Sequence, residues 1–186
     1  MRRLIVSEFV SLDGVMENPA WTLRFHSAGQ AQFKLDELLA ADALLMGRRT
    51  YEGFAAAWPT RTDEQGLASR MNSLPKYVVS ATLREPAWHN TQVLSGGLAE
   101  EITQLKAQPG QDILVYGSAR LVRALLQLGL ADEYRLMVFP IVVGSGQRLF
   151  ADDSAATLRL TGSRTFSSGV VLLTYQPGPP PAAPGA

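Results

Sequence analysis

The 186-residue sequence contains no cysteine, only two histidines, and equal numbers of basic and acidic residues, 17 of each. Without cysteine, disulfides and thiolate metal sites are excluded, and a reducing compartment fits. The zero net charge lacks the basic excess of nucleic-acid-binding proteins, so we predict no nucleic-acid partner. No apolar run approaches the roughly 18 residues of a membrane span. Ser7 and Glu8 interrupt the apolar N-terminus, unlike a signal peptide, so we expect a cytoplasmic protein with no membrane partner.

The length predicts one domain with a sizeable core, which we place at residues 1–176. The last ten residues, 177–186, are rich in proline, alanine and glycine. Such a composition cannot bury enough apolar surface to fold, so we expect a disordered tail.

Apolar and β-branched runs predict strands, and apolar residues at helical spacing predict helices. We expect strands at residues 4–10, 43–46, 77–80, 92–95, 112–116, 133–143, 157–162 and 170–175. We expect helices at residues 27–41, 50–58, 98–107 and 119–128, with an irregular polar segment at 60–75. Strands alternate with helices through residue 128 and then follow one another. This order predicts an α/β fold, with a mostly parallel central sheet and a C-terminal antiparallel hairpin.

A first candidate anion site lies where the strand at 43–46 runs into Gly47, Arg48, Arg49 and Thr50. Free N–H groups and the helix dipole attract phosphate at a helix start, and arginine is a bidentate phosphate donor. Ligands of open α/β sheets also sit at the carboxyl ends of strands. A solvated basic helix start, with Thr50 as an ordinary cap, explains the same residues.

Two further junctions carry small residues after strands. Ser80 ends one strand, where a plain turn is the alternative. Gly117, Ser118 and Ala119 join another strand to a helix, and small side chains there let a backbone approach a pyrophosphate. This second turn is not a GxGxxG fingerprint.

Taken in order, these motifs resemble the dihydrofolate-reductase-like superfamily over residues 3–175. The runs GRRTYEGFAAAW and SLDG, and the proline followed by Gly-x-Gly and Leu-Phe after residue 139, are most similar to the reductase domain of bacterial riboflavin biosynthesis, the RibD C-terminal family. The resemblance implies a dihydrofolate-reductase-like three-layer sandwich that binds NADPH. It also implies that arginine holds the 2′-phosphate, threonine the pyrophosphate and Ser80 the adenosine phosphate. The implied cofactor residues are Gly47, Arg48, Arg49, Thr50, Ser80, Gly117, Ser118, Ala119, Arg120 and Leu121.

The sequence departs from the resembling enzymes at two places. They often have consecutive glycines where this chain has Ser118 and Ala119, which puts a strained glycine–glycine peptide in doubt. Dihydrofolate reductases carry an acid on the first helix, and the matching position falls near Gly29 or Gln30. This second departure argues against folate reduction. Two acids further along that helix are expected to be solvated surface, namely Asp36 and Glu37.

The remaining candidate for catalysis or substrate contact is Asp13, although an Asp-Gly turn is good turn chemistry in its own right and is the favoured explanation of this residue. His26 is a weaker candidate proton donor. Three aromatic residues are candidates to hold a flat heterocyclic substrate, although aromatic residues are more often core: Trp21, Phe33 and Phe139.

The resemblance implies reduction of 5-amino-6-(5-phosphoribosylamino)uracil, whose phosphate requires a further cationic site. Arg148 and Arg164 are candidates for it. Reduction of dihydrofolate or another pterin, and a non-catalytic dimeric nucleotide-binding protein, stay open as alternatives. The resemblance further predicts a homodimer, for which the apolar strand at 133–143 is a candidate interface.

Overall fold

The computed structural model describes residues 1–63, 65–150 and 154–179. Its strands are β1 (Leu4–Ser11), β2 (Ala41–Gly47), β3 (Lys76–Val79), β4 (Thr91–Leu94), β5 (Asp112–Val115), β6 (Glu133–Phe139), β7 (Leu158–Thr165) and β8 (Val171–Pro177). Its helices are α1 (Ala28–Leu39), α2 (Arg48–Ala57), α3 (Leu67–Ser73), α4 (Leu98–Ala107) and α5 (Ala119–Gln127). A 3-10 helix, η1, spans Pro19–Phe25. Within these ranges no helix is long and apolar enough to cross a membrane.

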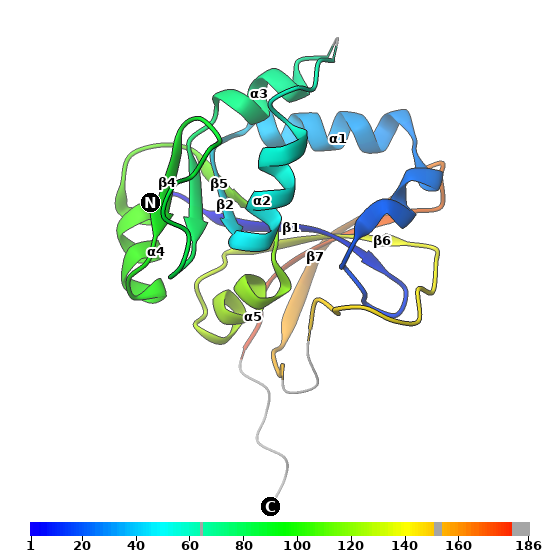
Figure 1. The fold of residues 1–186 in the computed structure, drawn as a ribbon. Helices are drawn as coiled ribbons and strands as arrows, with labels where there is room; N and C mark the ends of the chain where they lie inside the picture. The colour runs from blue at the N-terminus through cyan, green and yellow to red at the C-terminus, as the bar shows by residue number, and fades with distance from the viewer. Residues whose placement is uncertain (64, 151–153, 180–186) are drawn as a thin grey trace, which may run out of the picture.

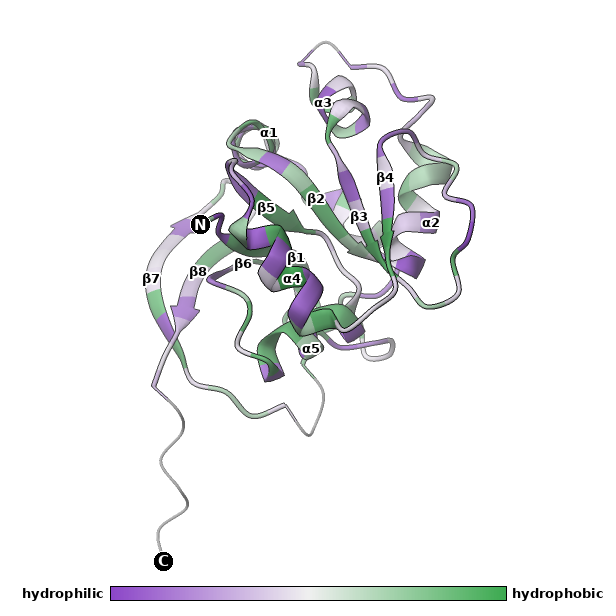
Figure 2. Ribbon diagram, turned by 90° about the vertical axis from the view of Figure 1, so that its left-hand side faces the viewer, coloured by the Kyte–Doolittle hydropathy of each residue, from purple (hydrophilic) through white to green (hydrophobic). Residues whose placement is uncertain are grey.

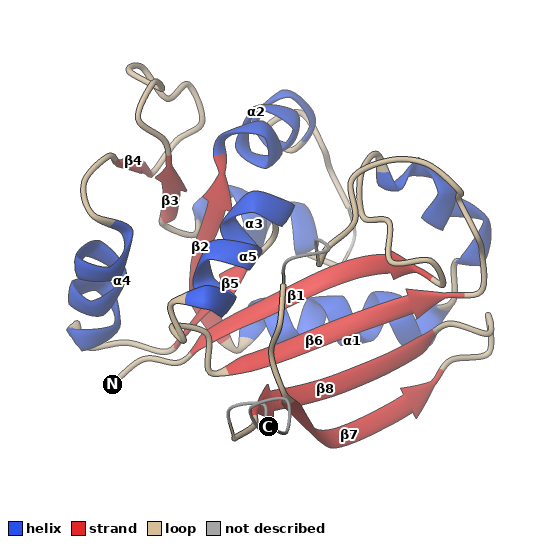
Figure 3. Cartoon of the chain, turned by 90° about the horizontal axis from the view of Figure 1, so that it is seen from below, coloured by secondary structure: helices blue, strands red, loops and turns tan. Residues whose placement is uncertain are grey.

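The described strands form one eight-stranded sheet in the order β4-β3-β2-β5-β1-β6-β8-β7. The first six strands in this order, from β4 across to β6, run parallel to one another. β8 is antiparallel to β6, and β7 is antiparallel to β8. Figure 3 shows β1, β6, β8 and β7 side by side in this order, with α1 behind them. The predicted fold class, a mostly parallel sheet with a C-terminal hairpin, is confirmed.

Helices cover both faces of the sheet, as Figure 1 shows. Side chains alternate between the faces of a strand, so Leu4 and Val6 of β1 pack with α4 and α5, whereas Ile5 packs with α1, α2 and α3. Central strands β2 and β5 are therefore mostly hydrophobic, with one aspartate each near their amino ends (Asp42 and Asp112), and the edge strand β7 carries hydrophilic residues (Figure 2).

Several boundaries differ from those predicted. The segment at 60–75 contains α3, which buries Ala68 and Met71, and the loop before α1 contains η1. The strand predicted at 133–143 ends at Phe139, because Pro140 has no N–H to continue the ladder. β8 reaches Pro177, where the tail was expected to begin, while 180–186 lie outside the described residues.

The position of β1 creates a switch point in the topology. β1 lies between β5 and β6, and the helices that follow β1 and β5 cover opposite faces. β5 pairs with β1 only as far as Val6 opposite Val115, whereas β6 follows β1 to Ser11. A crevice at such a point, beyond the carboxyl ends of the strands, is where open α/β sheets bind ligands.

Candidate functional site

The two predicted phosphate turns meet at one edge of the sheet, because β2 and β5 are neighbours. The Gly47 N–H donates a 2.9 Å hydrogen bond to the Gly117 carbonyl oxygen. A Cβ on Gly47 would lie 2.5 Å from the Ser118 Oγ, and one on Gly117, whose φ is +78°, would lie 2.7 Å from the Thr50 Oγ1. The peptide bond between Gly117 and Ser118 is cis. The turns therefore touch through backbone and small groups.

Each of these turns leads into a helix without a side-chain cap. α2 begins at Arg48 after Gly47, and α5 begins at Ala119 after Ser118; neither preceding residue caps its helix with a side-chain hydrogen bond. The first N–H groups of a helix lack partners inside it. Two adjacent positive helix ends are thus available to an anion.

The two arginines of α2 occupy different surroundings. Arg48 donates to Glu52 and to the Thr82 hydroxyl, both at 2.6 Å, and lies outside the cavity described below. Ser80 is buried and holds the same loop, since its Oγ accepts hydrogen bonds from the Thr82 and Leu83 N–H groups. Arg49 lines the cavity and has no partner among the described residues.

A cavity of about 830 Å³ opens beside these turns, between β1, η1, α1 and α2. Thr50, Gly117, Ser118 and Ala119 line it on the side of the turns. The opposite side is aromatic, where Phe139 lies at the centre of a cluster. Phe9 and Phe25 also line this side, with ring centroids 5.3 and 6.0 Å from that of Phe139.

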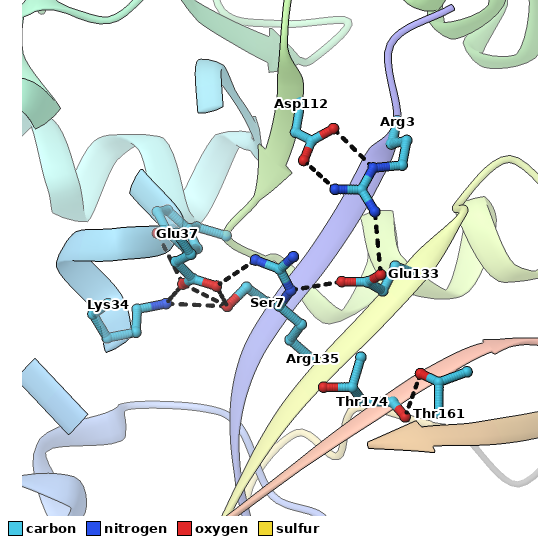
Figure 4. Close-up of polar contacts among 10 residues, drawn as sticks. Arg3, Ser7, Lys34, Glu37, Asp112, Glu133, Arg135, Thr161 and Thr174 are labelled. Carbon is cyan, nitrogen blue, oxygen red and sulfur yellow. Dashed lines mark hydrogen bonds and ion pairs between the residues drawn. The ribbon is translucent and has the colours of Figure 1, made fainter. Parts of the chain in front are cut away.

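Beside the cavity lies a buried network of charges around Glu37, drawn in Figure 4. The Ser7 hydroxyl donates to both Glu37 oxygens at 2.8 and 3.0 Å, and the Tyr116 hydroxyl donates to Oε1 at 3.2 Å. Lys34 forms a short ion pair with Glu37, and Arg135 lies 3.5 Å away on its other side. Burial and the Glu37 carboxylate raise the pKa of Tyr116 well above its usual value, so the phenol stays protonated.

The network continues from Arg135 toward the amino ends of the strands. Arg135 pairs with Glu133 at 2.7 Å, Glu133 with Arg3 at 3.5 Å, and Arg3 with Asp112 at 2.5 Å. Figure 4 shows this chain of pairs crossing from α1 over β1 to β6 and β5. Burial of Glu37 is thus compensated by two cations and two hydroxyl donors. Its cavity-side cation, Lys34, is fixed 4.3 Å above the Tyr116 ring.

The comparisons with known proteins agree with this geometry. The sequence profile of the RibD C-terminal domain family matches residues 2–172. The chain belongs to this family.

Two solved structures and one sequence relative place this RibD C-terminal domain among its neighbours. An uncharacterised Bacillus subtilis protein, YyaP, is 35% identical over 182 residues, which cover 94% of each chain. A putative riboflavin biosynthesis protein from Shewanella sp. PV-4 has a TM-score of 0.73 at 21% identity, covering 95% of this chain and 99% of the other. Enterococcus faecalis dihydrofolate reductase, complexed with NADP(H), has a TM-score of 0.65 at 12% identity, covering 95% and 97%. The dihydrofolate-reductase-like fold is thereby confirmed.

In this RibD C-terminal domain the ten predicted cofactor residues do not all lie together. Five of them line the cavity: Arg49, Thr50, Gly117, Ser118 and Ala119. Gly47 does not line the cavity but is hydrogen-bonded to Gly117. Arg48 and Ser80 contact the loop that follows β3. Arg120 is exposed outside the cavity, and Leu121 is in the core. The cofactor roles stay predictions.

Among the predicted substrate residues, only Phe139 lines the cavity. Trp21 packs edge-on against Phe139 at 5.5 Å, and Phe33 packs against Phe166 at 6.4 Å. Trp21 therefore packs against a lining residue, while Phe33 belongs to the same apolar cluster through Phe166, which does not line the cavity. Arg148 and Arg164 lie outside the cavity too, whereas Arg61 lines it, stacked 4.8 Å from the centre of the Trp58 ring.

Asp13, predicted as catalytic, lies outside the cavity lining. Its carboxylate accepts hydrogen bonds from the Ser11 hydroxyl at 2.6 Å and from the Val143 and Gly144 N–H groups at 3.0 and 2.8 Å. These bonds lower the pKa of Asp13 to about 2. The carboxylate is thus ionised near neutral pH and ties the end of β1 to the loop after β6. Its catalytic role stays a prediction that this geometry does not favour.

Two acids that face inward were not identified as functional from the sequence. Glu37 was expected to be solvated, yet only Asp36 is exposed; Glu37 is 4% exposed. Glu8 on β1 is 7% exposed and lines the cavity. The sequence did contain a signal for Glu8, because it interrupts the apolar face that β1 forms with Leu4, Val6 and Val10. A buried acid at such a position indicates a specific role.

The homodimer likewise stays a prediction. β6, the strand predicted to pair two chains, lies between β1 and β8 and has both backbone edges occupied. Two copies therefore cannot pair through the backbone of β6, and an interface formed by the side chains of this strand stays a prediction.

Proposed function

We propose that this RibD C-terminal domain is an NADPH-dependent reductase of a small heterocyclic substrate, closest to 5-amino-6-(5-phosphoribosylamino)uracil reductase. The meeting of the two uncapped turns at the cavity is the observation that carries this proposal. It places two uncapped helix starts, suited to an anion, beside a largely apolar cavity, and a phosphorylated dinucleotide with a hydride-donating ring needs both.

The residues present fit the dinucleotide. Gly47 and Gly117 keep the floor of the two turns free of side chains, which would collide with Ser118 and Thr50. Thr50 and Arg49 line the cavity beside them. NADP(H) in the dihydrofolate reductase of similar fold supports this choice of cofactor.

The 2′-phosphate fits the side of α2 that faces the loop after β3, at residues 80–83. Arg48 already reaches the Thr82 hydroxyl there, with Ser80 holding the loop in place. A guanidinium and hydroxyls are suitable phosphate ligands. Bound at this site, the cofactor supplies a hydride, while the chain orients the acceptor.

The substrate end is the aromatic part of the cavity. Phe9, Phe25 and Phe139 offer apolar surface to a flat ring, and Lys34 offers a positive charge beside it. Arg61 provides a second cation for a substrate that bears a phosphate. Family membership and the riboflavin-related Shewanella neighbour support the uracil substrate.

The proposal is tested by following NADPH oxidation with two candidate substrates. We expect oxidation with 5-amino-6-(5-phosphoribosylamino)uracil, coupled to formation of the ribityl product, and little with 7,8-dihydrofolate. Oxidation with dihydrofolate alone would replace the substrate assignment. No oxidation with either at saturating, bound NADPH would contradict the assignment of a riboflavin-type or folate-type reductase.

A further inference from the structure

Glu8 is a buried acid that lines the cavity. It stands on the core face of β1, just beyond the last residue that pairs with β5. Its Oε1 is buried and has no hydrogen-bond partner among the described residues. Buried polar atoms are nearly always satisfied, so an orphaned one at a cavity points to a ligand.

The nearby charges do not neutralise Glu8. On α1, Lys34 is committed to Glu37 and to the Ser7 hydroxyl, which lies 3.1 Å from Nζ. Glu37 of the same helix is a further negative charge. From the turn after β5, Gly117 offers only a backbone hydrogen bond. The other titratable groups that line the cavity are Glu17, His26, Arg49, Arg61 and Tyr116.

These surroundings favour the neutral carboxylic acid. Burial raises the pKa of Glu8 to about 8, and the Glu37 charge acts in the same direction, while the Gly117 hydrogen bond and Lys34 oppose it. A buried carboxyl that keeps its proton at neutral pH can donate it.

We propose that Glu8 is the general acid of this site, donating its proton to the nitrogen or oxygen of the substrate's C=N or C=O group. This inference rests on the proposed function. As the hydride bonds to the carbon, the π pair moves to the heteroatom, which takes the Glu8 proton. The substrate gains two hydrogens, the nicotinamide is oxidised, and the Glu8 carboxylate recovers a proton from solvent. The substrate class is a heterocycle, or its ribosyl branch, with such a polar double bond.

Other groups are less suited to this step. Asp13 is ionised and outside the cavity, and the Tyr116 proton is engaged with Glu37. Glu17 accepts the Gln147 N–H at 2.9 Å. His26 is exposed. Within the described part of the chain, Glu8 alone combines burial, an unpartnered oxygen and contact with the cavity.

The test compares wild type with Glu8→Gln, which keeps the shape but has no acidic proton. Glu100→Gln, on the exposed surface of α4, is the matched control. We expect Glu8→Gln to bind NADPH as wild type does, by fluorescence quenching. Its single-turnover reduction of 5-amino-6-(5-phosphoribosylamino)uracil or 7,8-dihydrofolate should be at least about 100-fold slower, the usual scale of general acid catalysis.

The pH profile separates catalysis from a structural effect. The wild-type rate should fall as pH rises through about 8, and Glu8→Gln should lose this limb. Glu8→Asp should recover part of the rate. A Glu8→Gln rate within about threefold of wild type, or an unchanged limb, would overturn the assignment.

A titration of the carboxyl itself decides the case if neither substrate turns over. In protein carrying ¹³C-labelled glutamate, the resonance missing from Glu8→Gln belongs to Glu8. A midpoint near pH 8 supports the proposal, and a Glu8 already ionised at pH 7 overturns it. Absence of NADPH binding by wild type would instead defeat the proposed function, whatever the state of Glu8.

Discussion

Gly47 and Gly117, 70 positions apart, are joined by a 2.9 Å hydrogen bond from the Gly47 N–H to the Gly117 carbonyl oxygen. This bond brings the two candidate phosphate turns into one site. Neither turn alone distinguishes a cofactor site from an ordinary helix start. Their contact beside a cavity is the observation that supports the proposed cofactor site.

Replacing Gly117 by alanine should damage this contact. The added Cβ would lie 2.7 Å from the Thr50 Oγ1, at a backbone φ of +78°. Gly129→Ala is the control, because its φ of +63° is similarly unfavourable but no atom lies within 4 Å of the new Cβ. We expect Gly117→Ala to weaken NADPH binding by at least about tenfold, roughly the value of one hydrogen bond, and Gly129→Ala to leave it unchanged. Equal affinities in both variants would show that the close packing of the turns is unimportant.

Arg48→Ala should weaken NADPH binding much more than NADH binding. In the proposed site this change removes a charge-assisted contact to the 2′-phosphate, worth about tenfold or more in affinity. Arg159→Ala, which removes an exposed arginine of β7, is the control. Isothermal titration with both nucleotides measures the difference. The same loss for both nucleotides would remove the 2′-phosphate role.

Much of this site follows from local sequence. Gly47 to Thr50 and Gly117 to Ala119 were located because strand-to-helix junctions have local signatures in residue type and order. The dihydrofolate-reductase-like order of strands and helices could be predicted for the same reason. The neighbouring positions of β2 and β5, which join the turns, depend on tertiary packing.

The inward-facing acids show where sequence reasoning fails. Glu37 lies on a helix whose periodicity equally allows a surface position, and its burial depends on Ser7 and Arg135 from β1 and β6. Glu8 looks like a polar interruption of a strand until the cavity is seen. α3 was missed because its polar sequence buries only two residues.

Asp13→Asn should lower stability without removing NADPH binding. The carboxylate now accepts the Val143 and Gly144 N–H groups on different oxygens, and asparagine replaces one of these oxygens by an NH2 group that cannot accept a hydrogen bond. Because the folded-state pKa of Asp13 is lowered to about 2 from 3.8, its stabilisation is complete above the ordinary value and is lost as pH falls toward 2. The difference in Tm between wild type and variant should therefore shrink in acid.

Asp36→Asn, on the exposed face of α1, is the control and should change Tm little. An Asp13→Asn variant that keeps its Tm but loses substrate reduction would return Asp13 to the catalytic role.

The stability of wild type should fall as pH rises between about 4.5 and 8. In this window the folded state keeps the Glu8 proton while the unfolded chain releases it. The Glu8 contribution to the free energy of unfolding therefore falls by about 1.4 kcal/mol for each pH unit. Glu8→Gln has no such proton, so its advantage over wild type should grow up to about pH 8 and then level off. Urea denaturation across this range measures the difference. Parallel curves for the two proteins would mean that Glu8 is ionised in the fold.

NADPH binding is the most direct test of the cofactor site. Trp58 lines the cavity, so a bound nicotinamide ring should quench tryptophan fluorescence. We predict saturable binding of one NADPH per chain, at least about tenfold tighter than NADH, as expected for charge-assisted bonds to the 2′-phosphate. The absence of saturable quenching and of binding heat with either nucleotide would contradict the central claim.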